Sequence, residues 1–269
     1  MIEKKILISY GNIKTKLFNY LKEIKIINFM KTLCIIPCFN EEHRIESLLI
    51  KIKKFKNQNK NIDFLFINDG STDATPNLIS KNKFKIINFT TNMGIGRALI
   101  NGYIYAKKNN YSILVHFAGN GKMNPDQINK VVNPIKKNNA DFVSGSRFLK
   151  NGGIKNTPYY RIFLIFFFSK FVSFLFKRNI SDASCGFRAF KLDLFNNFQK
   201  NYNQKRFYKY GYEYYTFGKI ISNNNKKFKE VSVTMNYPSK TIYTKMRPFI
   251  DWFAIVYYWL LGYYDNVNI

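Results

Sequence analysis

Between residues 31 and 147, short apolar runs alternate with longer segments of helical periodicity, and this alternation limits the possible folds more than any other feature of the chain. Apolar runs bounded by turn residues predict strands, and apolar residues at intervals of about three to four predict helices. Strands joined by helices run parallel, in a sheet that helices cover on both faces. We therefore predict an α/β fold with a mostly parallel sheet. The strands are expected at 32–36, 62–68, 84–89, 112–117 and 141–145, and the helices at 41–56, 74–82, 95–108 and 125–138.

Small and polar residues follow four of these predicted strands, at the point where each strand ends. They read Pro-Cys-Phe-Asn-Glu-Glu at 37–42, Asn-Asp-Gly-Ser-Thr-Asp at 68–73, Ala-Gly-Asn-Gly at 118–121 and Ser-Gly-Ser-Arg at 144–147. Each stretch alone is also explained by a helix N-terminus or a tight turn. Because the carboxyl ends of parallel strands meet at one edge of a sheet, the four together predict a binding cleft there. A nucleotide suits such a cleft, with Asp69 accepting hydrogen bonds from base or ribose and small residues letting the backbone approach phosphate.

The chain carries 43 Lys and Arg against 16 Asp and Glu, a formal charge of +27 over 269 residues. This charge favours anionic partners, namely phosphorylated substrates or an anionic membrane surface. A coding bias towards Lys and Asn is an alternative source of part of the excess. Nucleic acid is not expected as a partner, because no nucleic-acid-binding module is recognisable. The three cysteines, without zinc-type spacing, favour a reduced compartment, so we expect a cytoplasmic protein.

Seven motifs resemble those of a known enzyme family, in the same order. IIPCFNEE (35–42), FINDGSTDAT (66–75) and NMGIGRALINGY (92–103) are similar to the opening strand, the nucleotide-base loop and the glycine-punctuated helix start of the family 2 glycosyltransferases, which have the GT-A fold. SGSRF (144–148), ISDASCGFRAF (180–190), GYEYYT (211–216) and FKEVSVTMNYP (228–238) resemble the dolichol-phosphate mannosyltransferase branch, which uses polyprenyl phosphates. The resemblance implies an inverting glycosyltransferase that moves a sugar from a nucleotide-diphosphate donor to a polyprenyl-phosphate or envelope-glycan acceptor.

The same resemblance implies a set of binding residues. The donor nucleotide would be contacted by Pro37, Asn40, Glu41, Asp69, Gly94 and Gly119, with Asp69 at the base. Guanidinium groups bind phosphate through paired hydrogen bonds, and the basic candidates for phosphate oxygens are Arg147, Arg161, Lys170 and Arg188. Two alternatives stay open. Arg161 and Lys170 could extend from an interfacial helix into water, and Arg188 could form a structural ion pair with Asp182.

The need for a general base depends on the acceptor. The phosphate oxygen of a polyprenyl phosphate is already a nucleophile, so positioning and stabilisation of the leaving group are sufficient. A sugar hydroxyl instead needs a carboxylate that takes its proton. Asp182 and Glu213 are the candidates for that role by their positions in the motifs.

The chain departs from the family at the end of the fourth predicted strand. There the family has Asp-x-Asp, whose carboxylates bring a divalent cation to the donor diphosphate, and this chain has Ala118-Gly119-Asn120. Asn120 offers a metal an oxygen without charge, so binding of Mg²⁺ or Mn²⁺ does not carry over from the family. Two interpretations remain. Lys122, with Arg147 and Arg188, could supply fixed positive charge in place of the cation, or the site is degenerate and binds a nucleotide sugar or a membrane without turnover.

Two aromatic segments, at 158–178 and 246–265, predict helices on the acceptor side. Charged residues interrupt the apolar runs, so no segment is expected to span a membrane. Aromatic side chains favour the boundary between membrane and water, and we expect a protein held peripherally on the cytoplasmic membrane face. An ordinary buried helix is the alternative for 158–178.

These observations divide the chain into three parts. Residues 31–238 form the transferase domain, and residues 239–269 form an aromatic helix at the membrane interface. For residues 1–30 two interpretations stay open: a basic helix on the membrane surface, or a segment that precedes a native start at Met30.

Overall fold

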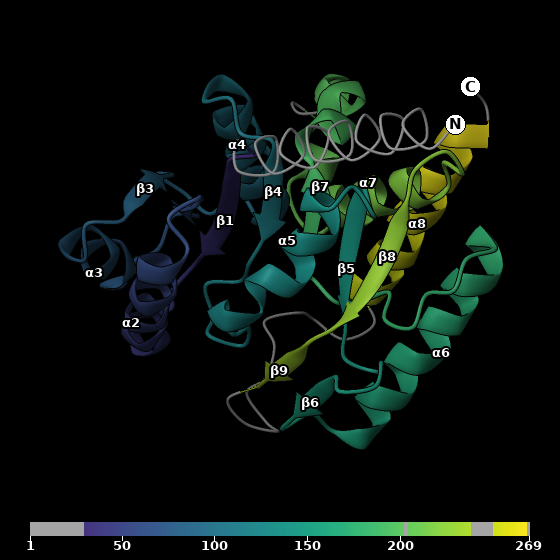
Figure 1. The fold of residues 1–269 in the computed structure, drawn as a ribbon, viewed down its shortest axis with the longest axis horizontal. Coiled ribbons are helices and arrows are strands. Elements are labelled where there is room, and N and C mark those ends of the chain that lie inside the picture. The colour runs from purple at the N-terminus through teal and green to yellow at the C-terminus, as the bar shows by residue number, and fades with distance from the viewer. Residues whose placement is uncertain (1–29, 202–203, 238–249, 268–269) are drawn as a thin grey trace, which may run out of the picture.

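A computed structural model describes residues 30–201, 204–237 and 250–267, with a seven-stranded sheet at its centre (Figure 1). The strands of this sheet are β1 (Thr32–Cys38), β2 (Ile62–Asn68), β3 (Lys85–Asn88), β4 (Ile113–His116), β5 (Phe142–Ser146), β7 (Arg188–Lys191) and β8 (Phe228–Ser232). They lie in the order β3-β2-β1-β4-β7-β5-β8. Neighbours pair in parallel except at β7, which is antiparallel to both β4 and β5. A separate small sheet pairs β6 (Gly153–Lys155) with β9 (Thr234–Asn236).

Helices cover both faces of the sheet, because each strand buries side chains alternately on its two sides. In β1, Cys34 and Ile36 belong to one core, and Leu33 and Ile35 belong to the other. The first core is completed by α2 (Glu42–Gln58), α3 (Thr75–Lys81) and α5 (Ile128–Lys136). The second is completed by α4 (Ile95–Lys108), α6 (Tyr159–Phe176), α7 (Gly211–Ile221) and α8 (Ile250–Val267).

The strands and helices predicted between residues 31 and 147 are confirmed, and β2 and α4 have the predicted bounds. The helix predicted at 125–138 is divided into a 3-10 turn, Pro125–Gln127, and α5. Asn124 begins the turn, and its side-chain oxygen accepts the N–H of Asp126 at 3.2 Å, as expected of a capping residue. The antiparallel strand β7, inserted between β4 and β5, was not predicted.

The two aromatic segments also form helices. The segment predicted at 158–178 is α6, and the described part of the segment at 246–265 is α8, which packs along α7. Small residues permit this close approach, because a Cβ on Gly262 would lie 2.5 Å from the carbonyl oxygen of Tyr215. Trp259 of α8 is fully buried, with its ring centroid 4.5 Å from that of Phe217. The interpretations for residues 1–29 lie outside the described residues.

The order of the strands reverses beside β1. β2 and β3 follow it on one side, whereas β4 lies on the other side. The loops that leave β1 and β4 therefore diverge, and sheets of this kind bind ligands in the crevice between such loops.

Candidate functional site

A cavity of about 660 Å³ lies at the carboxyl ends of β1 and β4. Its walls come from the loops after β1, β2, β4 and β5, from the first turn of α6, and from the first turns of α7 and α8. The candidate residues from the sequence line this cavity, except Lys170, Asp182 and Arg188. Those that line it are Pro37, Asn40, Glu41, Asp69, Gly94, Gly119, Asn120, Lys122, Arg147, Arg161 and Glu213. Their individual roles stay predictions.

The loops after β1 and β2 are tied together by hydrogen bonds. The backbone N–H of Asn40 donates to Ser71 Oγ at 3.0 Å, and Asn40 Oδ1 accepts the N–H of Thr72 at 2.9 Å. The N–H of Glu41 donates to Thr75 Oγ1 at 2.8 Å. These reciprocal bonds fix the two loops against each other, so the cavity wall that the nucleotide prediction requires is preformed.

Asp69 anchors a third loop to this wall. Its carboxylate accepts the backbone N–H groups of Met93, at 2.8 Å, and Gly94, at 2.9 Å. Burial raises the pKa of Asp69, and these two amides oppose that rise. Gly94 has a φ of +98°, and a Cβ there would lie 2.5 Å from the carbonyl oxygen of Tyr208. Asp69 is therefore an anchor of the loop, and its contact with a base stays a prediction.

The loop after β4 holds no metal-binding arrangement. The side-chain oxygen of Asn120 accepts the N–H of Lys122 at 3.3 Å. Ala118 and Gly119 have no side-chain oxygen that could bind a metal. In the part of the chain that the structure describes, no three His, Cys, Asp or Glu residues are grouped so that they could hold a metal ion. Hard divalent cations require several oxygen ligands, including charged ones. These residues do not fit Mg²⁺ or Mn²⁺.

Positive charge gathers instead around Tyr237, which follows β9. Lys122 Nζ lies 4.8 Å from the centroid of the Tyr237 ring, and the Arg161 guanidinium lies 5.6 Å from it. Arg147 Nη1 donates to the Tyr237 hydroxyl at 2.9 Å. All four residues line the cavity, so three cations surround one aromatic side chain at its wall.

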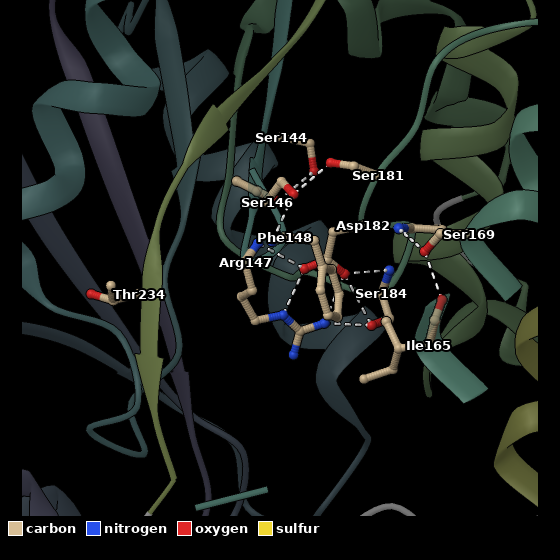
Figure 2. Close-up of polar contacts among 12 residues, drawn as sticks. Ser144, Ser146, Arg147, Phe148, Ile165, Ser169, Ser181, Asp182, Ser184 and Thr234 are labelled. Carbon is tan, nitrogen blue, oxygen red and sulfur yellow. Dashed lines mark hydrogen bonds and ion pairs between the residues drawn. The ribbon is translucent and has the colours of Figure 1, made fainter. Parts of the chain in front are cut away.

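Arg147 makes its strongest contacts within the protein. Its Nε and Nη2 donate to the two carboxylate oxygens of Asp182 at 2.6 and 2.7 Å, and Nη2 also donates to Ser184 Oγ at 2.6 Å (Figure 2). Burial lowers the pKa of Arg147, but the charge and hydrogen bonds of Asp182 outweigh it and raise the pKa overall. From the sequence, Arg147 was predicted to reach phosphate oxygens. In the structure its guanidinium forms an ion pair with Asp182.

Asp182 does not fit the role of a general base. Its side chain is fully buried, both of its oxygens accept hydrogen bonds from Arg147, and it lies outside the cavity lining. The alternative that paired it with Arg188 is also wrong. Arg188 Nη1 instead donates to Glu213 Oε1 at 3.0 Å, and Arg188 Nη2 donates to the carbonyl oxygen of Ala183. Arg188 lies behind the cavity, so it supports Glu213 and does not face a substrate.

Of the two carboxylates predicted as general bases, Glu213 is the one that lines the cavity. Burial raises its pKa, and the charge of Arg188 opposes this rise. His116 of β4 lines the same wall, with Nε2 hydrogen-bonded to the Tyr103 hydroxyl. Burial and the charge of Arg188 lower the pKa of His116, so the ring is neutral at physiological pH.

Helix α6 contributes to the cavity at its first turn only. Arg161 lines the cavity. Lys170 is exposed further along the helix, with its Nζ 5.5 Å from the centroid of the Phe166 ring. Lys170 is therefore not part of the site. By length and composition alone α6 is apolar enough to cross a membrane, and the prediction that no segment spans one stays a prediction. One side of α6 nevertheless packs on the domain, through the buried residues Ile165, Ser169, Val172 and Phe176.

Sequence reasoning missed Tyr237 and His116 as cavity residues. Tyr237 is the residue before the last in the FKEVSVTMNYP motif, and its position against Arg147 depends on a contact between residues 90 apart in the sequence. His116 is the polar residue that ends an otherwise apolar strand, and this was the one signal available in the sequence. Both side chains are recognised only once β4 and β9 are placed beside the same cavity.

The chain is similar to several known proteins. The family model for glycosyl transferase family 2 matches residues 33–198. The polyprenol monophosphomannose synthase of Mycolicibacterium smegmatis is 26% identical over 170 residues, which are 61% of this chain and 63% of that protein. The UDP-N-acetylglucosamine–dolichyl-phosphate N-acetylglucosaminyltransferase of Methanococcus voltae is 30% identical over 231 residues, which are 78% of this chain and 85% of that protein.

A solved structure shares the fold. Glucosyl-3-phosphoglycerate synthase from Mycobacterium tuberculosis, in complex with Mn²⁺ and UDP-glucose, superposes with a TM-score of 0.63 at 14% identity, over 92% of this chain and 83% of that one. The predicted GT-A fold is therefore confirmed. Because the family model matches more than half of the sequence, the chain belongs to glycosyl transferase family 2.

Proposed function

We propose that this chain transfers a sugar from a nucleotide-diphosphate donor to a polyprenyl phosphate, with inversion at the anomeric carbon. The observation that carries the proposal is the composition of the cavity, which joins the interlocked loops after β1 and β2 to the cations Lys122 and Arg161. Relatives from Mycolicibacterium smegmatis and Methanococcus voltae carry polyprenol and dolichyl phosphate in their names. The +27 charge of the chain suits two phosphorylated substrates.

The chemistry requires little proton transfer. A phosphate oxygen of the acceptor forms a bond to the anomeric carbon, and the bond from that carbon to the donor diphosphate breaks, with its electron pair leaving on the diphosphate. The attacking oxygen is already anionic, so no general base is needed, and the position of Asp182 in its ion pair is compatible with this. Lys122 stabilises the negative charge on the departing diphosphate, a task for which the described residues offer no cluster of metal ligands.

Transfer to lipid is the direct test. Purified full-length chain is incubated with radiolabelled UDP-, GDP- or TDP-sugars and a polyprenyl phosphate in detergent, without added metal. We expect one donor to give label in the organic phase. Gly119→Leu is the matched inactive control, since a Cβ at Gly119 already lies 2.9 Å from the carbonyl oxygen of Pro37. Label on a glycan would move the acceptor to that class, and no label with any donor would favour a degenerate, nucleotide-binding homologue.

The acceptor's lipid tail would lie at a membrane surface that α6 contacts. The outer side of this helix exposes Tyr159, Phe163, Phe167 and Phe174, each more than 60% accessible, whereas Arg161 on the same helix lines the cavity. An apolar surface of this kind is unfavourable in water, and aromatic residues favour the interface between membrane and water. With the charge of the chain, it supports peripheral attachment to the anionic cytoplasmic face of a membrane.

Membrane attachment is expected to depend on this surface. The chain should float with liposomes that contain anionic lipid, and the double variant Phe163→Ser/Phe167→Ser should partition at least about tenfold less, because burial of each Phe side chain contributes roughly 1.5–3 kcal/mol. Ile50→Ser, which removes a side chain 67% exposed on α2, is the control and should float as the unaltered chain does. Equal flotation of all three proteins would contradict the role of α6.

A further inference from the structure

Tyr237 is held in place from both sides by backbone hydrogen bonds. Its N–H donates to the carbonyl oxygen of Lys155, at the end of β6, and its own carbonyl oxygen accepts Asn156 Nδ2 at 2.9 Å. The preceding residue, Asn236, donates its N–H to the carbonyl oxygen of Lys122 at 3.0 Å. The Tyr237 side chain is 6% exposed. Its ring is therefore a rigid part of the cavity wall.

The two cations on the ring come from opposite parts of the site. Lys122 belongs to the loop after β4, which packs against β1 through the Gly119 N–H to Pro37 carbonyl bond of 3.2 Å. Arg161 belongs to the first turn of α6, the helix whose outer side is aromatic and exposed. Lys122 thus lies beside the loop after β1, and Arg161 lies on the helix that carries the exposed aromatic side chains. Tyr237 is the side chain that both contact.

Lys122 and Arg161 place two positive charges against one ring. The negative face of an aromatic ring attracts each of these cations. A preformed cluster of positive charge is also the arrangement that stabilises an anion without reorganisation during the reaction.

We propose that Tyr237 is a positioning residue that holds Lys122 against the leaving diphosphate and Arg161 against the incoming acceptor phosphate. This assignment rests on the proposed function, and it gives each of the two phosphate groups its own cation. The Tyr237 hydroxyl holds Arg147 in addition, while Asp182 neutralises that guanidinium. The ring, and not the hydroxyl, is the part of Tyr237 that positions the two cations.

Two substitutions at Tyr237 separate the ring from the hydroxyl. Tyr237→Phe keeps the ring and should change the KM of donor and acceptor by less than about threefold, whereas Tyr237→Leu should raise both by about tenfold, the equivalent of about 1.4 kcal/mol each. Lys122→Ala should raise the donor KM more than the acceptor KM, and Arg161→Ala should do the reverse. Tyr105→Leu is the matched control. Lys85 Nζ lies 5.2 Å from the centroid of the Tyr105 ring, and Tyr105 is outside the cavity lining.

A binding measurement keeps the test independent of turnover. Titration with inorganic pyrophosphate should show at least about tenfold weaker binding to Tyr237→Leu than to the unaltered chain, and near-equal binding to Tyr237→Phe and Tyr105→Leu. Near-UV circular dichroism reports whether each variant keeps its tertiary structure. Equal pyrophosphate affinity of the Leu variant and the unaltered chain, or failure of the unaltered chain to bind pyrophosphate, would overturn the assignment. A third result separates the two proposals. If the unaltered chain binds pyrophosphate, Tyr237→Leu weakens that binding and no sugar is transferred, the role of Tyr237 is supported and the proposed function is contradicted.

Discussion

Replacing Arg147 with methionine should lower the free energy of unfolding by about 3–5 kcal/mol, the range measured when one partner of a buried ion pair is removed. Arg147 is 4% exposed and Asp182 is fully buried, so the substitution leaves a carboxylate in the interior without its counter-charge. The variant also loses the hydrogen bonds to Ser184 and Tyr237. Urea denaturation, followed by tryptophan fluorescence, measures the difference.

The control is an ion pair on the surface. Lys56 and Asp63 are 3.8 Å apart and about half exposed, so Lys56→Met should change the free energy of unfolding by less than about 1 kcal/mol. The double variant Arg147→Met/Asp182→Leu should regain a large part of the stability, because it removes both buried charges. A loss below 1 kcal/mol in Arg147→Met would contradict the buried pair.

Replacing Lys122 with alanine should lower kcat for sugar transfer by about 100-fold to 1000-fold, the range seen when one preorganised group that stabilises developing charge is removed. Lys122 lines the cavity and lies in the loop after β4, where the family resemblance implies Asp-x-Asp and this chain has Ala118-Gly119-Asn120. Lys122→Arg keeps the charge and should recover part of the rate. Steady-state kinetics with the donor that the transfer screen identifies give the values.

Lys51→Ala, an exposed lysine on α2, is the matched control and should leave kcat within about twofold. An unchanged kcat in Lys122→Ala would show that the charge on the leaving diphosphate is stabilised elsewhere. Retained near-UV circular dichroism in Lys122→Ala would show that the loss of rate is not a loss of fold.

Most of the fold could be predicted from the sequence because local signals determine it. The apolar run at 62–68 and the helical period after Gly94 have the bounds of β2 and α4. The four strand ends were also informative, since parallel strands place their carboxyl ends at one edge whatever their order. The antiparallel strand β7 was not foreseen, because four residues give too short a pattern to distinguish a strand from a loop.

The pairing of charges could not be predicted, because it depends on which loops meet in space. Arg147 and Asp182 are 35 residues apart, and Arg188 and Glu213 are 25 apart. The prediction offered Arg188 and Asp182 as a pair and assigned Arg147 to phosphate. The structure pairs Arg147 with Asp182 and Arg188 with Glu213. The same reason explains Tyr237, whose ring meets Lys122 and Arg161 only after β9 is paired beside β6. Sequence patterns predicted which residues gather at this edge of the sheet, and tertiary contacts decide which of them pair.

We expect fixed cations around Tyr237, and not a divalent metal, to stabilise the leaving diphosphate. The most direct measurement is the initial rate of sugar transfer to polyprenyl phosphate after dialysis against EDTA, and again after addition of Mn²⁺ or Mg²⁺. We expect full activity in EDTA and a change of less than about twofold on addition of either metal, since the residues at 118–120 offer no carboxylate. Activity that is lost in EDTA and restored by metal would contradict the claim.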